Sequence, residues 1–440
     1  MEQLRYYLKV NWISIRRAPL PYALTILILS VGLGVFFANA TFYYWLNHDP
    51  LPHKSGTLFY PLVKSQPFVC DEGCAAPKIH SYRDVISLQQ SDIPSKSAAM
   101  YSAGAYVRLV PNTTDAASDL PAVGMSLRIT QRDFFSMFEV PVQHGDVWPD
   151  NTARHEVILS HDAALKLFGR TEVVGERLEL DHRMFTISAV LAPWRMFPRL
   201  YDPQNDGYLE ATEDIFLPLE TGYDLNYVSN RQSSSFDDAD YQKLASDGRT
   251  KALHQLQFWV QLDDANAQQA YADFMRHWVE EQKKVGRHPS ANQPQLVAMT
   301  DIMQTFKAQS QEVIAFALVT LLFLLVCLCN ACHLSLNRFI ANQYEISLRR
   351  ALGASRGQLQ LQLLADVCCT AGLALLLALP LAWLTVQGIS VLLPNQAVMA
   401  SWNGSLLGSM VLLTLCTSYL VTLYPALRAS FGNLSLQLKA

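Results

Sequence analysis

Charged residues are scarce in this sequence, and that scarcity excludes an ordinary soluble protein. Only 16% of the 440 residues are Asp, Glu, Lys or Arg, and 50% are hydrophobic, whereas soluble domains carry about 25% charged residues. Such a deficit indicates segments that lie in a lipid bilayer. The long polar section of the chain has no basic face of the kind that binds nucleic acid, so we expect no nucleic-acid partner.

Several catalytic and nucleotide-binding motifs are missing as well. The sequence has no Gly-x-x-x-x-Gly-Lys-Ser/Thr loop to hold ATP phosphates, no His-Glu-x-x-His zinc pair and no Gly-x-Ser-x-Gly nucleophile elbow. His144, His155, His161 and His182 have spacings that suit no metal motif, and we expect them to face solvent. The chain is therefore predicted to be non-catalytic, with no metal or cofactor of its own.

Cysteine is sparse outside the hydrophobic segments. Of the eight cysteines, only Cys70 and Cys74 lie in polar sequence, and in an oxidising compartment we expect them to form a disulfide. Cys329, Cys332 and His333 fit the Cys-x-x-Cys-His pattern of haem attachment. They lie in an apolar run, where cysteine acts as a small hydrophobic residue and a charged site is costly, so we assign them no haem or metal.

Four apolar stretches are long enough to cross a bilayer, which takes about 20 helical residues. The first exceeds the h-region of a signal peptide, about 7–15 residues, which favours a retained anchor. It contains Gly32 and Gly34, which either admit a neighbouring helix or only reflect the abundance of glycine in such helices. The expected transmembrane helices are residues 20–44, 311–335, 359–387 and 404–425.

Charge placement predicts how these segments are oriented. Acidic residues outnumber basic ones in the polar section, residues 45–310, whereas the flanking segments are basic, as expected for an external domain and cytoplasmic loops. Residues 1–19 form an amphipathic pattern expected to lie along the inner membrane surface. Both termini are then cytoplasmic. The remaining connections are a cytoplasmic segment at 336–358, an outer loop at 388–403 and a cytoplasmic tail at 426–440.

The polar section shows strand and helix patterns at both of its ends. We therefore expect an α+β domain of two subdomains, a split outer one with a middle subdomain inserted at about 119–220. Residues 195–250, rich in Asp, Ser, Asn and Gly, are predicted to be an insertion or mobile loop. The expected elements are strands at Thr57–Val63, Leu256–Leu262 and Leu296–Met299, a strand or pair of strands at Ser97–Val110, and helices at Ser81–Gln90 and Asn266–Lys284.

Two features near the third apolar stretch are candidates for function. Residues 342–358 are basic and helix-compatible, with Gly353 able to end a helix; they form either an ordinary cytoplasmic loop or a helix that receives force from a soluble partner. Apart from Glu312 at the very start of the second range, Asp366 is the one carboxylate inside a predicted span. It is either a functional intramembrane acid or an acid near the interface that pairs with Arg356.

These segments resemble a known family. Glu345-Ile-Ser-Leu-Arg-Arg-Ala-Leu-Gly-Ala-Ser355 resembles the coupling segment of MacB/FtsX-type ABC transporter permeases, the type VII mechanotransmission family. Residues 127–138 followed by Gly145, residues 156–169, 174–178 and 185–190 resemble MacB-type periplasmic domains, and Tyr424-Pro-Ala-Leu-Arg428 resembles the exit of the family's last helix. The family's tail proline is missing here.

The resemblance implies a subunit of the bacterial inner membrane that acts with other chains. Such permeases pair with a second copy or a related permease and bind a cytoplasmic ABC ATPase dimer, which holds the ATP and Mg. Tyr344, Glu345, Arg349, Arg350, Gly353 and Ala354 would contact that ATPase. A glutamate usually stands near the position of Asp366 in the family, which implies a role in packing or coupling.

Several functions remain open within this resemblance. The first is export of a peptide, toxin or antibiotic with a periplasmic adaptor and an outer-membrane channel. The alternatives are lipoprotein extraction, as in Lol-type relatives, and regulation of a cell-wall enzyme, as in FtsX. A large external domain favours export over regulation. A membrane sensor is a further alternative, although it would need a cytoplasmic output domain.

Overall fold

The computed structural model divides into two compact units. The helical unit comprises residues 1–47 and 309–440, and the α+β unit comprises residues 48–308. The structure describes residues 13–17, 19–63, 79–109, 121–203, 210–231, 234–235, 250–288, 293–309, 311–341, 356–392, 402 and 404–431.

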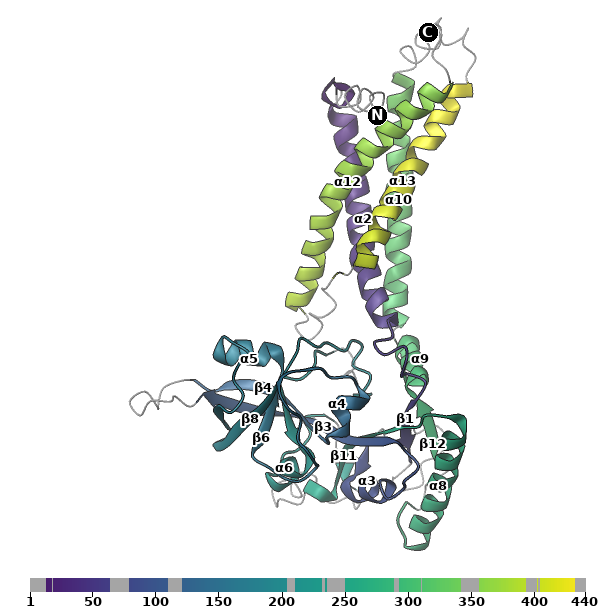
Figure 1. Ribbon diagram of the computed structural model, residues 1–440. Coiled ribbons are helices and arrows are strands. Elements are labelled where there is room, and N and C mark those ends of the chain that lie inside the picture. The colour runs from purple at the N-terminus through teal and green to yellow at the C-terminus, as the bar shows by residue number, and fades with distance from the viewer. Residues whose placement is uncertain are drawn as a thin grey trace, which may run out of the picture. The chain divides into compact units, whose positions relative to one another are not determined.

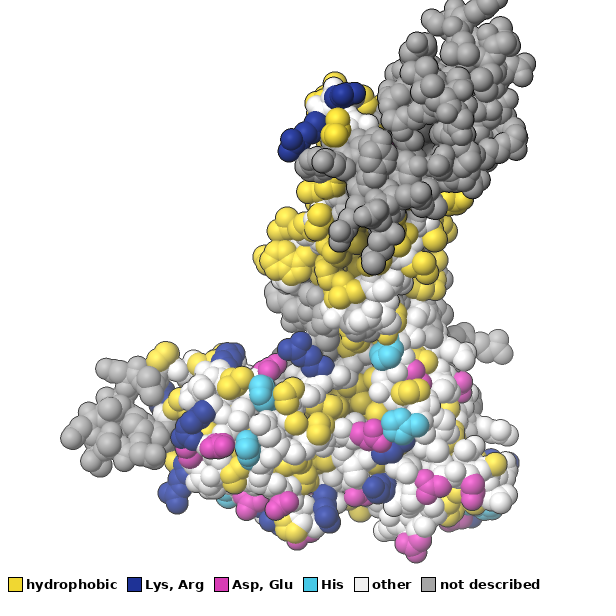
Figure 2. Space-filling view, turned by 45° about the horizontal axis from the view of Figure 1, so that its top comes forward, with side chains coloured by type: hydrophobic (Ala, Val, Ile, Leu, Met, Phe, Trp, Pro, Cys, Tyr) yellow, Lys and Arg dark blue, Asp and Glu magenta, His cyan; other side chains and the backbone are white. Residues whose placement is uncertain are grey.

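Four long helices make up most of the described part of the helical unit, which also has helical residues 13–17. All four are apolar enough to span a membrane. Their surface is dominated by hydrophobic side chains, whereas charged side chains of both signs are spread over the α+β unit (Figure 2). The prediction of four transmembrane helices with a large α+β domain is confirmed. The helices are α2 (Pro19–Asn47), α10 (Gln311–Ala341), α12 (Arg356–Leu392) and α13 (Gly404–Phe431) (Figure 1). They extend beyond the predicted apolar stretches, because a helix can continue into the polar interface.

Helix α2 packs against both α10 and α12. Its buried stripe of Ile26, Leu29, Leu33 and Phe37 has helical spacing and shares a core with three alanines of α12 at four-residue steps. A Cβ atom on Gly32 would lie 2.8 Å from the Cβ of Cys327 on α10, and one on Gly34 would lie 3.0 Å from Leu381 on α12. The two glycines thus admit neighbouring helices, which decides between the two interpretations of them.

The α+β unit is built on one mixed sheet with the order β12-β1-β11-β3-β4-β9-β6-β8-β5 among the described residues. Strands β2 and β10 pair with β11, and β7 pairs with β3 and β8. The strands are β1 (Leu58–Leu62), β2 (His80–Ser81), β3 (Lys96–Leu109), β4 (Val123–Thr130), β5 (Val142–Gly145), β6 (Glu156–Leu159), β7 (Arg177–Leu180), β8 (Arg183–Leu191), β9 (Ile215–Pro218), β10 (Ser234–Ser235), β11 (Leu253–Gln261) and β12 (Gln295–Ala298).

Three helices of this unit start at residues whose side chains cap them. Ser81 caps α3, Ser160 caps α5 and Asp264 caps α8, each accepting a hydrogen bond from a backbone N–H of the first turn. The buried Tyr271, Met275 and Trp278 of α8 share the core of the sheet. The helices are α3 (Tyr82–Leu88), α4 (Asp133–Met137), α5 (His161–Phe168), α6 (Leu219–Asp224), η2 (Thr250–Ala252), α8 (Ala265–Lys284) and α9 (Met299–Gln309).

The predicted strands and helices at the two ends of this unit are confirmed within a few residues. Strand β3 links the end and middle sections, because Met100 pairs with Gln257 of β11 on one side and with Thr130 of β4 on the other. For the described residues of 195–250, the alternative of a mobile loop is wrong, whereas that of an insertion remains a prediction. Strand β9 lies in the sheet between β4 and β6, and the polar residues around it hid that buried strand from the composition argument.

Candidate functional sites

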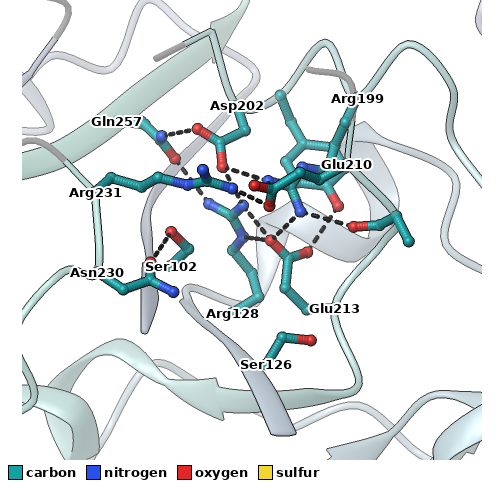
Figure 3. A network of polar contacts seen from close by, with 12 residues as sticks. Ser102, Ser126, Arg128, Arg199, Asp202, Glu210, Glu213, Asn230, Arg231 and Gln257 are labelled. Atoms are coloured by element: carbon teal, nitrogen blue, oxygen red, sulfur yellow. Dashed lines mark hydrogen bonds and ion pairs between the residues drawn. The ribbon is translucent and has the colours of Figure 1, made fainter. Parts of the chain in front are cut away.

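Arg128 on β4 lies at the centre of a buried polar network in the α+β unit (Figure 3). Its Nη2 lies 2.7 Å from Asp202 Oδ2, its Nε lies 3.0 Å from Glu213 Oε1, and its Nη1 donates to Gln257 Oε1 of β11 at 2.8 Å. All three partners are fully buried or nearly so. The network therefore ties β4 and β11 to the chain before β9.

A second guanidinium completes the network. Arg199 lies 3.0 Å from Asp202 and 2.9 Å from Glu213, and Tyr201 donates a hydrogen bond of 2.8 Å to Glu213. The ring of Tyr201 stacks on Trp194, with 6.0 Å between ring centroids. At the partly exposed edge, Arg231 pairs with Glu210.

The charges in this network balance. Burial alone would raise the pKa of Asp202 and Glu213, but the positive charges of Arg128 and Arg199 keep the pKa of both carboxyls below their ordinary values. Both acids are therefore ionised at neutral pH. With Arg231 and Glu210, three cations face three anions. Such a closed set fixes the geometry of the chain around it and offers no unsatisfied charge to a substrate.

A smaller cluster surrounds Asp84 at the start of α3. Asp84 Oδ1 lies 3.0 Å from His288 Nε2 and accepts from Arg287, while Ser81 donates to Oδ2 at 2.8 Å and His254 Nε2 lies 3.9 Å away. Burial would raise the pKa of Asp84, but the hydrogen bond and charge of His288 and the charge of Arg287 lower it overall. This cluster joins α3 to β11 and to the turn after α8.

His80 lies beside this cluster and is also buried. Its Nε2 contacts the carbonyl of Pro61 at 2.8 Å. Burial lowers the pKa of His80 to about 4, although the nearby charge of Asp84 acts in the opposite direction. In the part of the chain that the structure describes, no three His, Cys, Asp or Glu residues are placed to hold a metal ion.

Asp366 lies inside the helical unit, on α12, and is 7% exposed. Tyr22 of α2 donates a hydrogen bond to its Oδ1 at 3.3 Å, and Thr370 bonds the backbone carbonyl of Asp366 at 2.9 Å. Intramembrane carboxyls that face the bundle interior and have a partner are candidates for a functional role. Asp366 therefore lies inside the bundle with Tyr22 as a partner, while its pairing with Arg356, whose side chain lies outside the described residues, remains a prediction.

Comparison with family models decides what kind of protein this is. The MacB-like periplasmic core domain matches residues 22–277, and the FtsX-like permease C-terminal domain matches residues 317–434. The chain belongs to the MacB/FtsX-type permeases of ABC transporters. It is thus a membrane protein with an external domain. The members of this family are transmembrane permease subunits, and membership implies an ABC ATPase partner.

Solved structures of external domains are also similar to this permease. The periplasmic region of MacB from Actinobacillus actinomycetemcomitans is 11% identical with a TM-score of 0.36, and covers 59% of this chain and 98% of that one. The extracellular domain of YknZ, a noncanonic ABC-type transporter from Gram-positive bacteria, is 15% identical with a TM-score of 0.33. The match covers 55% of this chain and 98% of that one.

A domain of a putative permease from Porphyromonas gingivalis is 15% identical with a TM-score of 0.36, and covers 56% of this chain and 91% of that one. No curated protein matches. The family assignment therefore rests on the sequence models.

The predicted site residues of this permease are only partly placed. Asp366 is described, whereas the predicted disulfide of Cys70 and Cys74 lies outside the described residues, as do the coupling residues Tyr344, Glu345, Arg349, Arg350, Gly353 and Ala354. These assignments remain predictions.

Sequence reasoning missed both clusters of the α+β unit. Arg128 stands in an alternating strand pattern that predicts an exposed side chain, and Asp84, His254 and His288 are far apart in the sequence. A weak signal was present in β11, where Gln255 and Gln257 alternate with apolar residues inside a strand that is buried on both faces.

Proposed function

We propose that this chain is a permease subunit that couples ATP hydrolysis, carried out by a separate cytoplasmic ATPase, to a conformational change in its external α+β unit. The observation that supports this most is the presence of both family domains in one chain, at residues 22–277 and 317–434. The sequence carries no phosphate-binding loop of the Gly-x-x-x-x-Gly-Lys-Ser/Thr type. ATP and Mg would therefore bind to the partner, and this chain would carry no catalytic residue.

The helix packing suggests how the force would pass. The coupling residues Tyr344, Glu345, Arg349, Arg350, Gly353 and Ala354 lie between α10 and α12 in the sequence. Both helices pack closely against α2, which has glycine at the two contact positions, Gly32 and Gly34. Because tightly packed helices move together rather than deform, a push on the segment would displace α2 and α10. Each leads directly along the chain to the α+β unit.

We further propose that the motion serves export of a peptide, toxin or antibiotic with a periplasmic adaptor and an outer-membrane channel. The size of the α+β unit, residues 48–308, supports export over regulation of a cell-wall enzyme. In this proposal both termini lie in the cytoplasm of a bacterium and the α+β unit lies in the periplasm. The basic character of residues 342–358 supports that orientation.

Co-purification with the products of its neighbouring genes tests the proposal. A P-loop ATPase is expected in stoichiometric amounts, and Arg349→Glu with Arg350→Glu is expected to abolish stimulation of its ATPase activity by the permease. The matched control is Arg108→Glu with Arg183→Glu, two reversals in the α+β unit, which should leave stimulation intact. Full stimulation by the coupling variant would overturn the coupling assignment.

The same preparation separates the alternatives. An adaptor protein among the co-purified chains would select export, and a lipoprotein released from membranes on ATP addition would select extraction. If no ATPase binds at all, the transporter proposal fails.

A further inference from the structure

Residues 48–57, which join α2 to the sheet and are called the connector below, are folded rather than extended. The backbone N–H groups of Lys54 and Ser55 both donate to the carbonyl of Leu51, at 2.9 and 2.8 Å, and Leu58 donates to the carbonyl of Lys54 at 3.2 Å. Leu51 and Ser55 are buried. The connector follows α2 directly along the chain. Because a packed, compact segment transmits displacement rather than absorbing it, movement of α2 reaches the connector as a whole.

Side chains of the connector hold the end of α4. Lys54 Nζ donates to the backbone carbonyl of Ser136 at 2.9 Å and lies 3.0 Å from Glu139 Oε1. His53 Nε2 lies 2.8 Å from the same carboxylate oxygen. The hydrogen bond with His53 lowers the pKa of Glu139 below its ordinary value, and Lys54 acts in the same direction. The last carbonyls of a helix have no partner within it, so Lys54 supplies one and attaches the connector to α4.

The backbone of Glu139 has an unfavourable conformation. Its φ is +52°, in the left-handed region, just after the residue that caps the C-terminus of α4. Glycine is the usual residue there, because a Cβ atom is strained at positive φ. The other non-glycine residues with positive φ in the described part of the chain are Asp181, His182, Asn226 and His288. Asp, Asn and His are enriched in this region, whereas Glu is not. Retained strain of this kind points to a role for the side chain.

Helix α4 is in turn embedded in the core of the α+β unit. Phe134 and Phe138 are fully buried and pack against Tyr201, with 5.2 and 5.5 Å between ring centroids. Phe138 also packs against Trp259 of β11 at 5.7 Å. Tyr201 is hydrogen-bonded within the Arg128 network. A displacement of α4 therefore acts on the network that joins β4 to β11.

We propose that Glu139 is a positioning residue: through it the connector displaces α4 when α2 moves, and α4 passes the displacement to the Arg128 network. This inference deepens the proposed function and rests on it, since ATP-driven movement of α2 is the source of the displacement. Without these side-chain contacts, α2 would act on the unit only through the backbone of β1. That strand lies between β12 and β11 at one end of the sheet.

Hydrogen exchange of the full-length chain, co-purified with its ATPase and placed in lipid nanodiscs, tests this route. Exchange is compared without nucleotide and with ATP, Mg and vanadate, for peptides that cover residues 133–145 and β1. Glu139→Lys places a positive charge opposite Lys54 and His53, and we expect it to abolish the nucleotide-dependent change in 133–145 but not in β1. Addition of Lys54→Glu should restore part of that change, because opposite charges face each other again although the bond to Ser136 is lost.

Glu139→Gly separates the proposed role from a stabilising one. Glycine relieves the strained φ, so the unfolding temperature should not fall, yet the response of residues 133–145 should be lost. Glu281→Lys is the matched control, because Glu281 also forms an exposed ion pair with a lysine, Lys284 of α8, and it should leave the response intact. A response retained in both Glu139 variants would overturn the inference, and so would an equal loss in Glu281→Lys.

ATP hydrolysis by the same preparations keeps this inference apart from the proposed function. Loss of the response in Glu139→Lys with hydrolysis retained supports the route, because the ATPase works and only the displacement is missing. A response of 133–145 that persists in this variant counts against the route alone. If nucleotide changes exchange nowhere in residues 48–308 of the original chain, the proposed function fails, and the route fails with it.

Discussion

Tyr22 and Asp366 stand 344 positions apart in the chain, and a hydrogen bond of 3.3 Å joins the phenol of one to the carboxyl of the other. Both side chains are buried in the helical unit. The bond lies between α2 and α12, so Asp366 helps to hold the first membrane helix against the third. Removal of either partner leaves a buried polar group with fewer bonds.

A double-mutant cycle on this pair is expected to show coupling. Tyr22→Phe removes the donor and keeps the ring, and Asp366→Ala removes the acceptor. Hydrogen bonds between membrane helices contribute about 0.6 kcal/mol on average and up to about 1.7 kcal/mol, so we expect a coupling energy in that range from thermal unfolding of the full chain in detergent. A coupling energy of zero would mean that the bond does not stabilise the packing of α2 on α12.

Substitution of Gly32 is expected to separate α2 from α10. A Cβ at this position would lie 2.8 Å from the Cβ of Cys327, closer than two carbon atoms can approach, and such overpacking costs about 1–3 kcal/mol. We expect Gly32→Val to lower the unfolding temperature and to weaken ATPase stimulation. Gly408→Ala is the control, because a Cβ there meets nothing within 4 Å. Equal effects of the two substitutions would contradict the close-packing argument.

Arg128→Ala is expected to destabilise the α+β unit strongly. The substitution would leave Asp202 and Glu213 buried without their main counter-charge, and loss of one partner of a buried ion pair costs about 3–5 kcal/mol. The comparison variant is Arg108→Ala, whose partner Glu179 lies 3.5 Å away at the partly exposed surface, where such pairs contribute less than about 1 kcal/mol. Protease resistance and thermal unfolding of the full chain would measure the difference.

Stability of the α+β unit is expected to decrease on mild acidification because of His80. Its pKa is about 4 in the folded chain and about 6.5 when unfolded. Between these values the unfolded chain binds more protons, so stability falls as the pH decreases from 6.5 to 4, by at most about 1.4 kcal/mol per pH unit for this group. The stabilising contribution of Asp84, whose folded pKa is lowered, is lost only at lower pH, below about 3.9.

The variant His80→Gln should remove most of that dependence. Thermal unfolding of the full chain at pH 7 and pH 4.5 measures it, with His182→Gln as the exposed control. The slope in this pH range should be smaller for His80→Gln than for the original chain and unchanged for His182→Gln. An unchanged slope for His80→Gln would assign the acid sensitivity to other groups.

Local patterns in the sequence were sufficient for the membrane helices and for the elements at the two ends of the α+β unit. The apolar runs predicted four membrane helices because only length and hydrophobicity decide whether a helix spans a bilayer. Strands such as β1 and β11 and the amphipathic helix α8 followed from periodicity. Strand β9 was missed because it is only four residues long and stands among acidic and polar neighbours. Such a short apolar run shows no alternation from which a strand could be predicted.

The sequence by itself determined the family and the number of spans, since both depend on short segments read in order. The tertiary structure alone decided which polar residues meet. Arg128 finds Asp202, Glu213 and Gln257, and Asp84 finds His288, across separations that no local pattern encodes. It also decided which face of α10 stays uncovered, because burial depends on the three-dimensional arrangement of α2, α12 and α13 around that helix. The physical reason is that hydrophobic periodicity specifies which face of a helix or strand is buried. Packing and charge balance across the whole fold decide which other element that face contacts.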